Sequence, residues 1–155
     1  MQLKFMEMAL KEAKKAFDKD EVPIGAVIVS SGKVVAKAHN QTQTKKLATA
    51  HAEILAIEKA SKKYPSWRIE NAEMYITLEP CAMCAGAIAN ARINKVYFGA
   101  YEEKSGCAES KYPILADNGL NHVVKYTGGV LKEECANLLK EYFKQKRKEK
   151  KYKKQ

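Results

Sequence analysis

The middle of this sequence switches repeatedly between the hydrophobic alternation of strands and the wider spacing of helices. A β-branched run at 22–29 and a partner segment at 34–39 enclose a Ser-Ser-Gly turn, and this arrangement predicts a β-hairpin. A helix is then expected from about 50 to 62, followed by a buried strand at 74–78. A hairpin followed by alternating helices and strands predicts an α/β domain of three layers, in which helices cover both faces of a mixed sheet.

The remaining segments bring the expected sheet to about five strands and supply helices at both ends of the chain. Pro80 stops the buried strand and stands before an Ala-rich stretch, so a helix is expected directly after it. The other expected elements are, in chain order, a helix over 3–17, a loop over 41–49, a helix over 81–91, strands at 95–99 and near 122–126, and a helix from 131 onward.

The net charge of +10 is concentrated at the C-terminal end of the sequence. From 143 to 155 there are eight basic residues and one acidic residue. Such a tail either contacts a polyanion such as nucleic acid or forms the solvated face of a helix. We therefore divide the chain into a domain over 1–143 and a basic helical extension over 144–155.

Composition also narrows the class of protein. The hydrophobic content of 46% suits a globular domain, and the longest apolar run, over 81–89, is far shorter than the stretch of about 20 residues that a membrane helix needs. We expect no membrane segment and a cytoplasmic location. In a reducing compartment, the four cysteines favour metal binding or catalysis over disulfides.

Two short motifs carry the chemistry, His-Ala-Glu at 51–53 and Pro-Cys-Ala-Met-Cys at 80–84. They supply one imidazole and two thiolates, the nitrogen and sulfur ligands that suit zinc, from His51, Cys81 and Cys84. The two cysteines lie one helical turn apart, so both sulfurs can face one metal. Both motifs begin an expected helix, where the positive end of the helix dipole favours the thiolate over the thiol.

Three protein ligands leave the fourth position of a tetrahedral zinc site to water, which is the arrangement of catalytic sites. A zinc-bound water ionises near neutral pH and becomes a nucleophile. Glu53, two residues after His51, is close enough to accept the proton of that water and return it to a leaving group. The residues therefore predict a hydrolytic site.

Two simpler interpretations remain open. The same three ligands could form a closed, structural zinc site with Cys107 or Cys135 as the fourth ligand, or the paired cysteines could be small buried residues on an Ala-rich helix. Glu53 argues against the closed site, because a carboxylate is a costly neighbour for thiolates. We interpret the other histidines, His39 and His122, as packing or hydrogen-bonding residues rather than ligands.

The order of the motifs, H-x-E before P-C-x-x-C, resembles the signature of the zinc-dependent nucleobase deaminases. Over nearly its whole length the chain resembles the bacterial tRNA adenosine deaminases of the cytidine and deoxycytidylate deaminase family, which convert adenosine to inosine at the wobble position of the anticodon. The segments that carry this resemblance are 22–27, 49–54, 77–87, 98–100, 121–122, 133–135, 142–143 and 147.

The resemblance implies a cytidine-deaminase-like sandwich and a homodimer with one Zn²⁺ per subunit. It implies that His51, Cys81 and Cys84 bind the zinc. Glu53 would shuttle protons while the activated water attacks C6 of adenine and ammonia leaves. The groups implied to line the base pocket are the side chain of Asn40, the backbone amide of Ala52 and the backbone carbonyl of Leu78.

The resemblance also implies contacts with the tRNA anticodon stem-loop outside the base pocket. The candidate residues are Glu102, Lys104, His122, Phe143, Lys144 and Arg147. The chain departs from the family pattern at Leu47-Ala48, where the family has Asp-Pro, and in the loop at 101–106. Neither departure touches the zinc motifs.

We therefore expect an enzyme, a zinc-dependent hydrolase that deaminates adenosine in the single-stranded anticodon loop of tRNA. A loop base is splayed into a pocket at lower cost than a base in a duplex. A deaminase of free bases or nucleosides, such as guanine or cytosine, would share every zinc residue and is the alternative. A non-catalytic, zinc-stabilised RNA-binding module is the third hypothesis.

Overall fold

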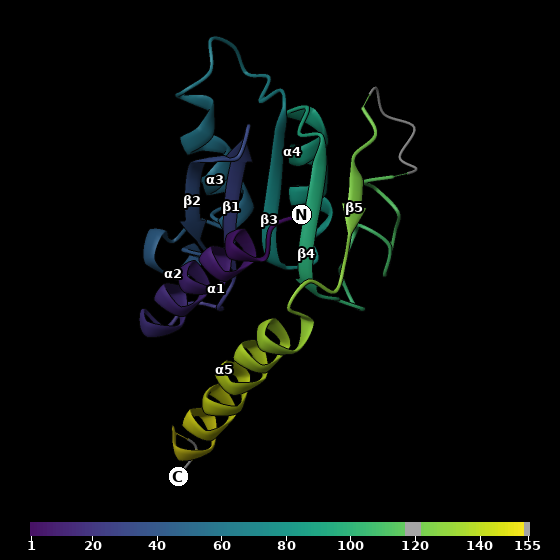
Figure 1. Cartoon of the computed structure of the whole chain (residues 1–155). Coiled ribbons are helices and arrows are strands. Elements are labelled where there is room, and N and C mark those ends of the chain that lie inside the picture. Colours follow the sequence, from purple (N-terminus) through teal and green to yellow (C-terminus); the bar gives the residue numbers. More distant parts are fainter. Residues whose placement is uncertain (117–121, 154–155) are drawn as a thin grey trace.

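The computed structural model describes residues 1–116 and 122–153, which form a five-stranded sheet with helices on both faces (Figure 1). The strands are β1 (Gly25–Ser30), β2 (Lys33–His39), β3 (Ala72–Leu78), β4 (Lys95–Ala100) and β5 (Lys125–Thr127). The helices are α1 (Leu3–Asp18), α2 (Thr42–Lys45), α3 (Ala52–Ser61), α4 (Ala82–Asn90) and α5 (Lys132–Lys153). The three-layer α/β fold with a mixed sheet, predicted from the sequence, is confirmed.

The strand order β2-β1-β3-β4-β5 gathers several strand ends at one edge of the sheet. β1 pairs antiparallel with β2 and β3, and β3 to β5 run parallel. The register sets Gly25 opposite His39 and Leu78 opposite Ala100. We call the edge formed by these four residues the carboxyl edge, because β2, β3 and β4 all end there. In α/β sheets, ligands bind outside the carboxyl ends of the strands.

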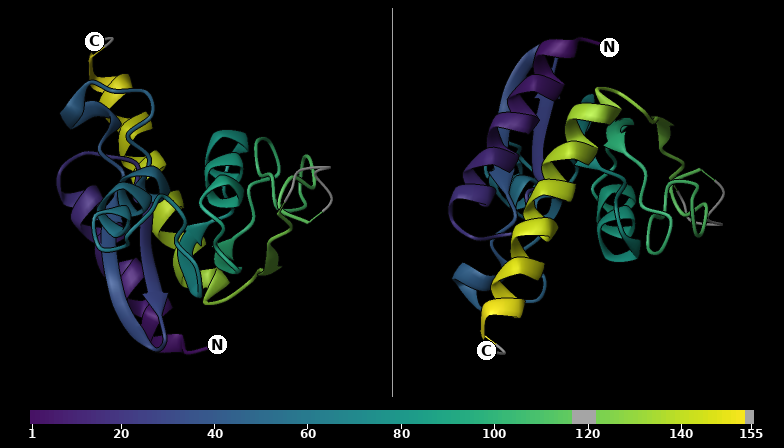
Figure 2. Two further views of the ribbon diagram at one scale, coloured as in Figure 1. Left: turned by 90° about the horizontal axis from the view of Figure 1, so that it is seen from above. Right: turned by 90° about the horizontal axis from the view of Figure 1, so that it is seen from below.

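The two faces of the sheet are covered by different pairs of helices, α1 and α5 on one side and α3 and α4 on the other (Figure 2). Side chains along β3 alternate between these faces, as the pleat requires. Tyr75 packs under α1, where its ring stacks on Tyr97 of β4 with centroids 4.7 Å apart. Met74 and Ile76 point to the opposite face, toward the Ala-rich helices. The core is therefore double, with the sheet between its halves.

The N-terminal part of the predicted hairpin is shorter than the sequence indicates, since β1 begins at Gly25 and not at Val22. Pro23 has no amide proton to give to a ladder. The amide of Ile24 donates instead to the carbonyl of Val22 at 2.8 Å, which turns the chain before the strand. At Gly25 the chain then passes so close to α1 that an added Cβ would lie 2.0 Å from the carbonyl oxygen of Ala9.

The loop predicted over 41–49 is wrong in one part, because Thr42–Lys45 forms the short helix α2. The buried carboxylate of Glu21 accepts the amide protons of Gln43 and Thr44 at 3.0 and 2.6 Å. These amides belong to the first turn of the helix, where no intrahelical acceptor exists. A tertiary contact thus builds a helix where the local sequence has no helical period.

β5 is also shorter than the strand expected near 122–126. Before the ladder begins, Nε2 of His122 lies 2.7 Å from the carbonyl oxygen of Ile93, and the amide of Val124 donates to Leu115 at 2.8 Å. Tertiary hydrogen bonds therefore replace strand pairing at 122–124.

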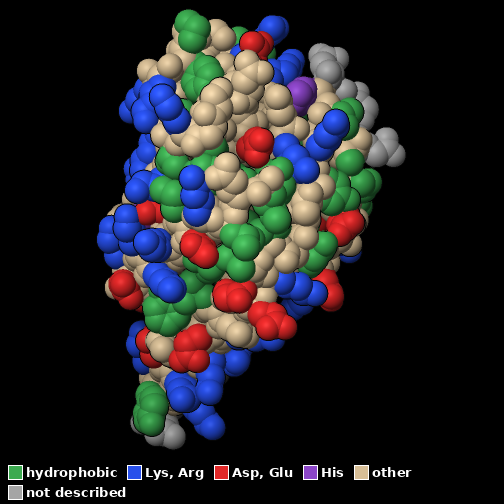
Figure 3. All heavy atoms as spheres, viewed as in Figure 1, with side chains coloured by type: hydrophobic (Ala, Val, Ile, Leu, Met, Phe, Trp, Pro, Cys, Tyr) green, Lys and Arg blue, Asp and Glu red, His purple; other side chains and the backbone are tan. Residues whose placement is uncertain are grey.

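Helix α5 runs without interruption across 143–144, so the basic extension continues the helix that packs on the sheet. Its distal half leaves the body of the molecule, and Lys and Arg side chains crowd around it (Figures 1 and 3). The hydroxyl of Tyr142 donates to the carbonyl of Asp20 at 3.2 Å, and Lys146 pairs with the Asp20 carboxylate. Among the residues that the structure describes, no helix has the length and apolarity to cross a membrane.

Candidate functional site

His51, Cys81 and Cys84 meet at the carboxyl edge and form a compact group of metal-type ligands. Nδ1 of His51 lies 3.6 Å from Sγ of Cys81 and 3.5 Å from Sγ of Cys84. All three ligand atoms lie within 4.8 Å of one another, and Cys84 is buried while the other two residues are half-buried. The two motifs, 30 residues apart in the sequence, are therefore brought together as one donor set.

The ligands owe their place to the starts of two helices. His51 is the N-cap of α3 and Cys81 is the N-cap of α4, both with extended backbone (φ −74° in each). Cys84 follows in the first turn of α4, so its sulfur faces the same space as that of Cys81. The positive ends of two helix dipoles thus point toward this donor set.

The electrostatics of the group favour one thiolate. The hydrogen bond from Cys84 and the nearby imidazole of His51 together outweigh burial and lower the pKa of Cys81 to about 4. The same hydrogen bond to Cys81, together with burial, raises the pKa of the Cys84 thiol, and the hydrogen bond to Cys81 raises the pKa of His51. A thiolate is the form of cysteine that binds metals and acts as a nucleophile.

Glu53 lies in the first turn of α3, beside this group, and is only 4% exposed. Burial raises the pKa of its carboxyl group to about 7. Its Oε1 has no hydrogen-bond partner among the residues that the structure describes. A buried carboxylate oxygen without a donor is costly in a merely structural setting, so this atom points to a ligand that completes the site.

The donor set fits a borderline-soft divalent ion such as zinc, because it combines one imidazole with two sulfurs. The two other cysteines lie outside the group in the described residues. The Cys107 thiol donates to the carbonyl of Ser105 at 3.5 Å, and Sγ of Cys135, on α5, packs against Gly99. This arrangement speaks against a closed site with Cys107 or Cys135 as the fourth ligand.

The three groups expected to line a base pocket also lie at the carboxyl edge. Asn40 follows β2, is 5% exposed, and has an Oδ1 without a partner among the described residues. Ala52 is the first residue of α3, where a backbone amide has no acceptor inside the helix. Leu78 ends β3. The side chain of Asn40, the end of a strand and the start of a helix thus lie at the same edge of the sheet as the metal-type ligands.

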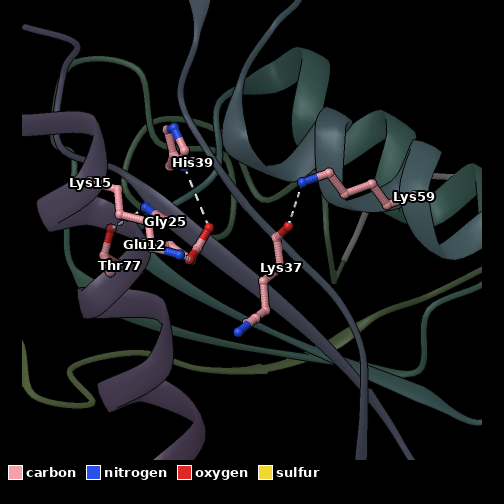
Figure 4. Close-up of polar contacts among 7 residues, drawn as sticks. All are labelled: Glu12, Lys15, Gly25, Lys37, His39, Lys59 and Thr77. Atoms are coloured by element: carbon pink, nitrogen blue, oxygen red, sulfur yellow. Dashed lines mark hydrogen bonds and ion pairs between the residues drawn. The ribbon is translucent and has the colours of Figure 1, made fainter. Parts of the chain in front are cut away.

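His39 does not join the metal-type ligands but pairs with α1 (Figure 4). Its Nδ1 lies 3.4 Å from Oε1 of Glu12, and the other oxygen of Glu12 pairs with Lys15 at 2.6 Å. Burial lowers the pKa of His39. The interpretation of His39 as a hydrogen-bonding residue agrees with this contact, which fixes the end of β2 just before Asn40.

The candidate RNA contacts fall into three separate places. Glu102 and Lys104 lie in the loop after β4, and Lys104 lines a cavity together with Cys81. Phe143, Lys144 and Arg147 are exposed on the distal half of α5. His122 bonds to Ile93, just before β4 begins and so at the end of the sheet opposite the carboxyl edge. Asn121, part of the resemblance, lies outside the described residues.

Sequence reasoning missed a cavity of about 380 Å³ beside the metal-type ligands. The start of α4 forms one side and the loop after β4 forms the other. Its lining residues are Cys81, Ala82, Met83, Lys104, Ser105, Cys107, Lys111 and Tyr112. It also missed the buried Glu79, which anchors that loop. Its only signal was the position of Glu79 inside the motif around Pro80.

Comparisons with known proteins agree with this site. The profile of the family described as MafB19-like deaminase matches residues 2–147. A tRNA-specific adenosine deaminase of Bacillus subtilis (strain 168) is 48% identical over 95% of this chain and 91% of its own length. A solved structure from a study of A-to-I editing by tRNA:A34 deaminases at the wobble position is 42% identical, with a TM-score of 0.86 over 89% of this chain and 100% of that one.

A structure of guanine deaminase from Bacillus subtilis is less similar, at 30% identity and a TM-score of 0.60 over 71% of this chain and 81% of that one. This deaminase therefore shares the fold, at a lower identity and TM-score than the tRNA deaminase structure. The assignment follows from the sequence identity of these relatives, and the chain belongs to the tRNA-specific adenosine deaminase family.

Proposed function

We propose that this protein converts adenosine to inosine at the wobble position of a tRNA anticodon by hydrolysis, with water consumed and ammonia released. The observation that carries the proposal is the buried Oε1 of Glu53, which has no hydrogen-bond partner in the described part of the chain and lies beside the donor set of His51, Cys81 and Cys84. A structural zinc site has no use for such a carboxylate, whereas a deaminase needs a proton carrier at this place.

We assign the metal to one Zn²⁺ per subunit, held by His51, Cys81 and Cys84. When bound, zinc supplies a water acidic enough to deprotonate near neutral pH. Glu53 accepts the proton of the water that attacks C6 and delivers it to the departing amino group. Burial, which raises the pKa of this carboxyl group, suits the role because it favours the protonated form that must later give up its proton.

Other groups of the chain hold the base. In this proposal, the side chain of Asn40, the amide of Ala52 and the carbonyl of Leu78 bind the purine edge and fix C6 against the site. Orientation of this kind converts a bimolecular reaction into an effectively unimolecular one. The low exposure of Asn40 and Glu53 also keeps bulk water away from the reacting atoms.

The RNA partner is the anticodon stem-loop, and we propose that the deaminase domain over 1–143 and the extension over 144–155 share its binding. Glu102, Lys104, His122 and Phe143 remain candidate contacts from the domain. Lys144 and Arg147 are exposed on the projecting part of α5, where they suit RNA phosphates. A tRNA substrate fits a cytoplasmic location.

We also propose a homodimer whose contact covers α3 and α4. A shallow cavity of about 290 Å³ lies between these helices and is lined mostly by apolar surface, including Ile57, Trp67 and Ala87. Trp67 is 58% exposed, which is unusual for so large an apolar side chain. A second copy of the chain would bury this surface.

The test compares RNA with free bases on one protein sample of known zinc content. We expect inosine from an anticodon stem-loop with adenosine at the wobble position, and none from the same hairpin with that adenosine moved into the stem. Guanine, cytosine, adenosine and cytidine should release no ammonia. Ammonia from a free base at a rate equal to or above that of the hairpin would instead support the free-base alternative. If neither the hairpin nor any free base or nucleoside reacts, the non-catalytic module is supported.

A further inference from the structure

Glu79 accepts hydrogen bonds from the loop that follows β4, although α4 and β4 separate the two in the sequence. It is 2% exposed. Oε1 accepts the amide proton of Glu102 at 3.1 Å and a hydrogen bond from the Ser110 hydroxyl. Oε2 accepts the amide protons of Ala108, Glu109 and Ser110 at 3.1, 2.9 and 2.9 Å. One carboxylate thus satisfies four backbone amides from both ends of this loop.

The loop closes tightly around this carboxyl group. At Gly106 an added Cβ would lie 2.4 Å from Oε1 of Glu79 and 2.4 Å from the carbonyl oxygen of Glu102. The next amide, of Cys107, donates to the carbonyl of Pro80 at 2.7 Å. The loop is therefore fastened to Glu79 and Pro80, the two residues that lead directly into Cys81.

The same loop forms one side of the cavity of about 380 Å³ that opens at Cys81. Lys104 and Lys111 bring two ammonium groups to its lining, and Tyr112 brings an aromatic ring that is 59% exposed. Ammonium groups suit the phosphates of RNA, and an exposed ring suits its bases. The positions of these three side chains therefore depend on the position of the loop.

We propose that Glu79 is a positioning residue for the RNA substrate, which acts by holding the loop at 102–112 as a wall of the site beside Cys81. This inference rests on the proposed function. Glu79 acts through the loop, and the atoms that donate to it come from loop residues rather than from the metal-type ligands. Its loss should therefore weaken the binding of RNA more than the chemistry.

The test is Glu79→Gln in the full-length, zinc-loaded chain. Glutamine keeps the size of the side chain, but in either orientation its NH₂ group faces loop donors that need an acceptor. We expect the KM for the anticodon stem-loop to rise about tenfold while kcat stays within about threefold, with one zinc per chain retained. The control is Phe5→Leu, a core change at the far end of α1, beside Val29 and Glu73, which should leave both constants unchanged.

Ser110→Ala gives a second measurement in case Glu79→Gln folds poorly, because it removes one donor and leaves the carboxylate in place. We expect its KM to rise about threefold with kcat unchanged. If the wild type makes inosine but both variants keep its KM, or lose kcat and zinc together, the inference is overturned and the proposed function stands. If the wild type makes no inosine from the hairpin, the proposed function falls and this inference falls with it.

Discussion

Glu53 and Glu79 are both buried at the carboxyl edge, 4% and 2% exposed. The pKa values of their carboxyl groups are nevertheless shifted in opposite directions. Burial raises the pKa of Glu53 to about 7. Burial also acts on Glu79, but the hydrogen bonds from Ser110, Glu109 and Glu102 outweigh it and lower its pKa. Both side chains have little exposed surface, and the two residues differ in the hydrogen-bond donors that surround them.

This difference shows that two buried carboxyl groups at one edge of a sheet can serve different purposes, depending on their hydrogen-bond donors. A carboxylate with several donors stays charged and fixes the chain around it. A carboxylate oxygen without a donor is kept at a cost in stability, and such groups gather where a reaction needs a proton carrier. We therefore propose a catalytic role for Glu53 and a loop-positioning role for Glu79.

The largest expected effect is on catalysis, from Glu53→Gln. Without a carboxyl group to carry the proton, we expect kcat to fall by about 10²- to 10⁴-fold, which is the usual range for general acid–base catalysis. Zinc content, measured by atomic spectroscopy, and the melting temperature should match the wild type. A variant that keeps the wild-type kcat would show that Glu53 does not carry the proton, and the proposed difference in role between Glu53 and Glu79 would no longer hold.

The next effect is on stability, where the two glutamates should behave in opposite ways. In chemical unfolding of the metal-free chain at pH 8, we expect Glu79→Gln to lower the free energy of unfolding by about 2–4 kcal/mol, because buried donors lose a charged acceptor. Glu53→Gln should cause no loss, because it replaces a buried carboxylate whose Oε1 has no partner among the described residues. Equal losses in both variants would contradict the distinction drawn from their donors.

The features that could be predicted from the sequence are those set by local patterns, whereas contacts between residues far apart in the sequence could not be predicted. The donor set was predictable, because His51 and Cys81 stand directly before helices and the ends of neighbouring strands meet at one edge. The role of Glu79 was not, because its donors lie 23 to 31 residues further along the chain. A charged residue does not contribute to a hydrophobic pattern, so the sequence around Glu79 gives no sign that its side chain is buried. Strand order was not predictable for the same reason, as pairing is a long-range property.

The candidate RNA contacts illustrate the same limit on a surface. Lys144 and Arg147 were proposed from the basic tail together with the resemblance, and the structure adds that they lie on a helix continuous with the core. His122 was proposed from resemblance, and the structure gives it a hydrogen bond to Ile93, away from the carboxyl edge. A motif predicts the type of a group, but only tertiary contacts decide which way it faces.

A smaller effect should appear in the pH dependence of stability. The folded pKa of Glu79 is lowered, so its stabilising contribution is complete above its pKa in the unfolded chain and disappears as the pH falls through the lower folded value. The gap in unfolding free energy between wild type and Glu79→Gln should thus be constant from pH 6 to 8, near neutrality, and should shrink in acid. A gap that grows in acid would mean that Glu79 is protonated in the folded protein.

The smallest expected effect is that of replacing Glu21, a third buried glutamate, which tests whether the loss of stability follows the number of hydrogen-bond donors. Its buried carboxylate accepts two amides, those of Gln43 and Thr44, and these bonds outweigh burial and lower its pKa. With fewer donors than Glu79, Glu21→Gln should lower the free energy of unfolding by about 1–2 kcal/mol at neutral pH. Hydrogen exchange should also quicken at the amides of α2 and leave those at 108–110 protected. If Glu21→Gln costs as much as Glu79→Gln, the number of donors is not what separates these buried glutamates, and the distinction would have to come from the chain segments they hold.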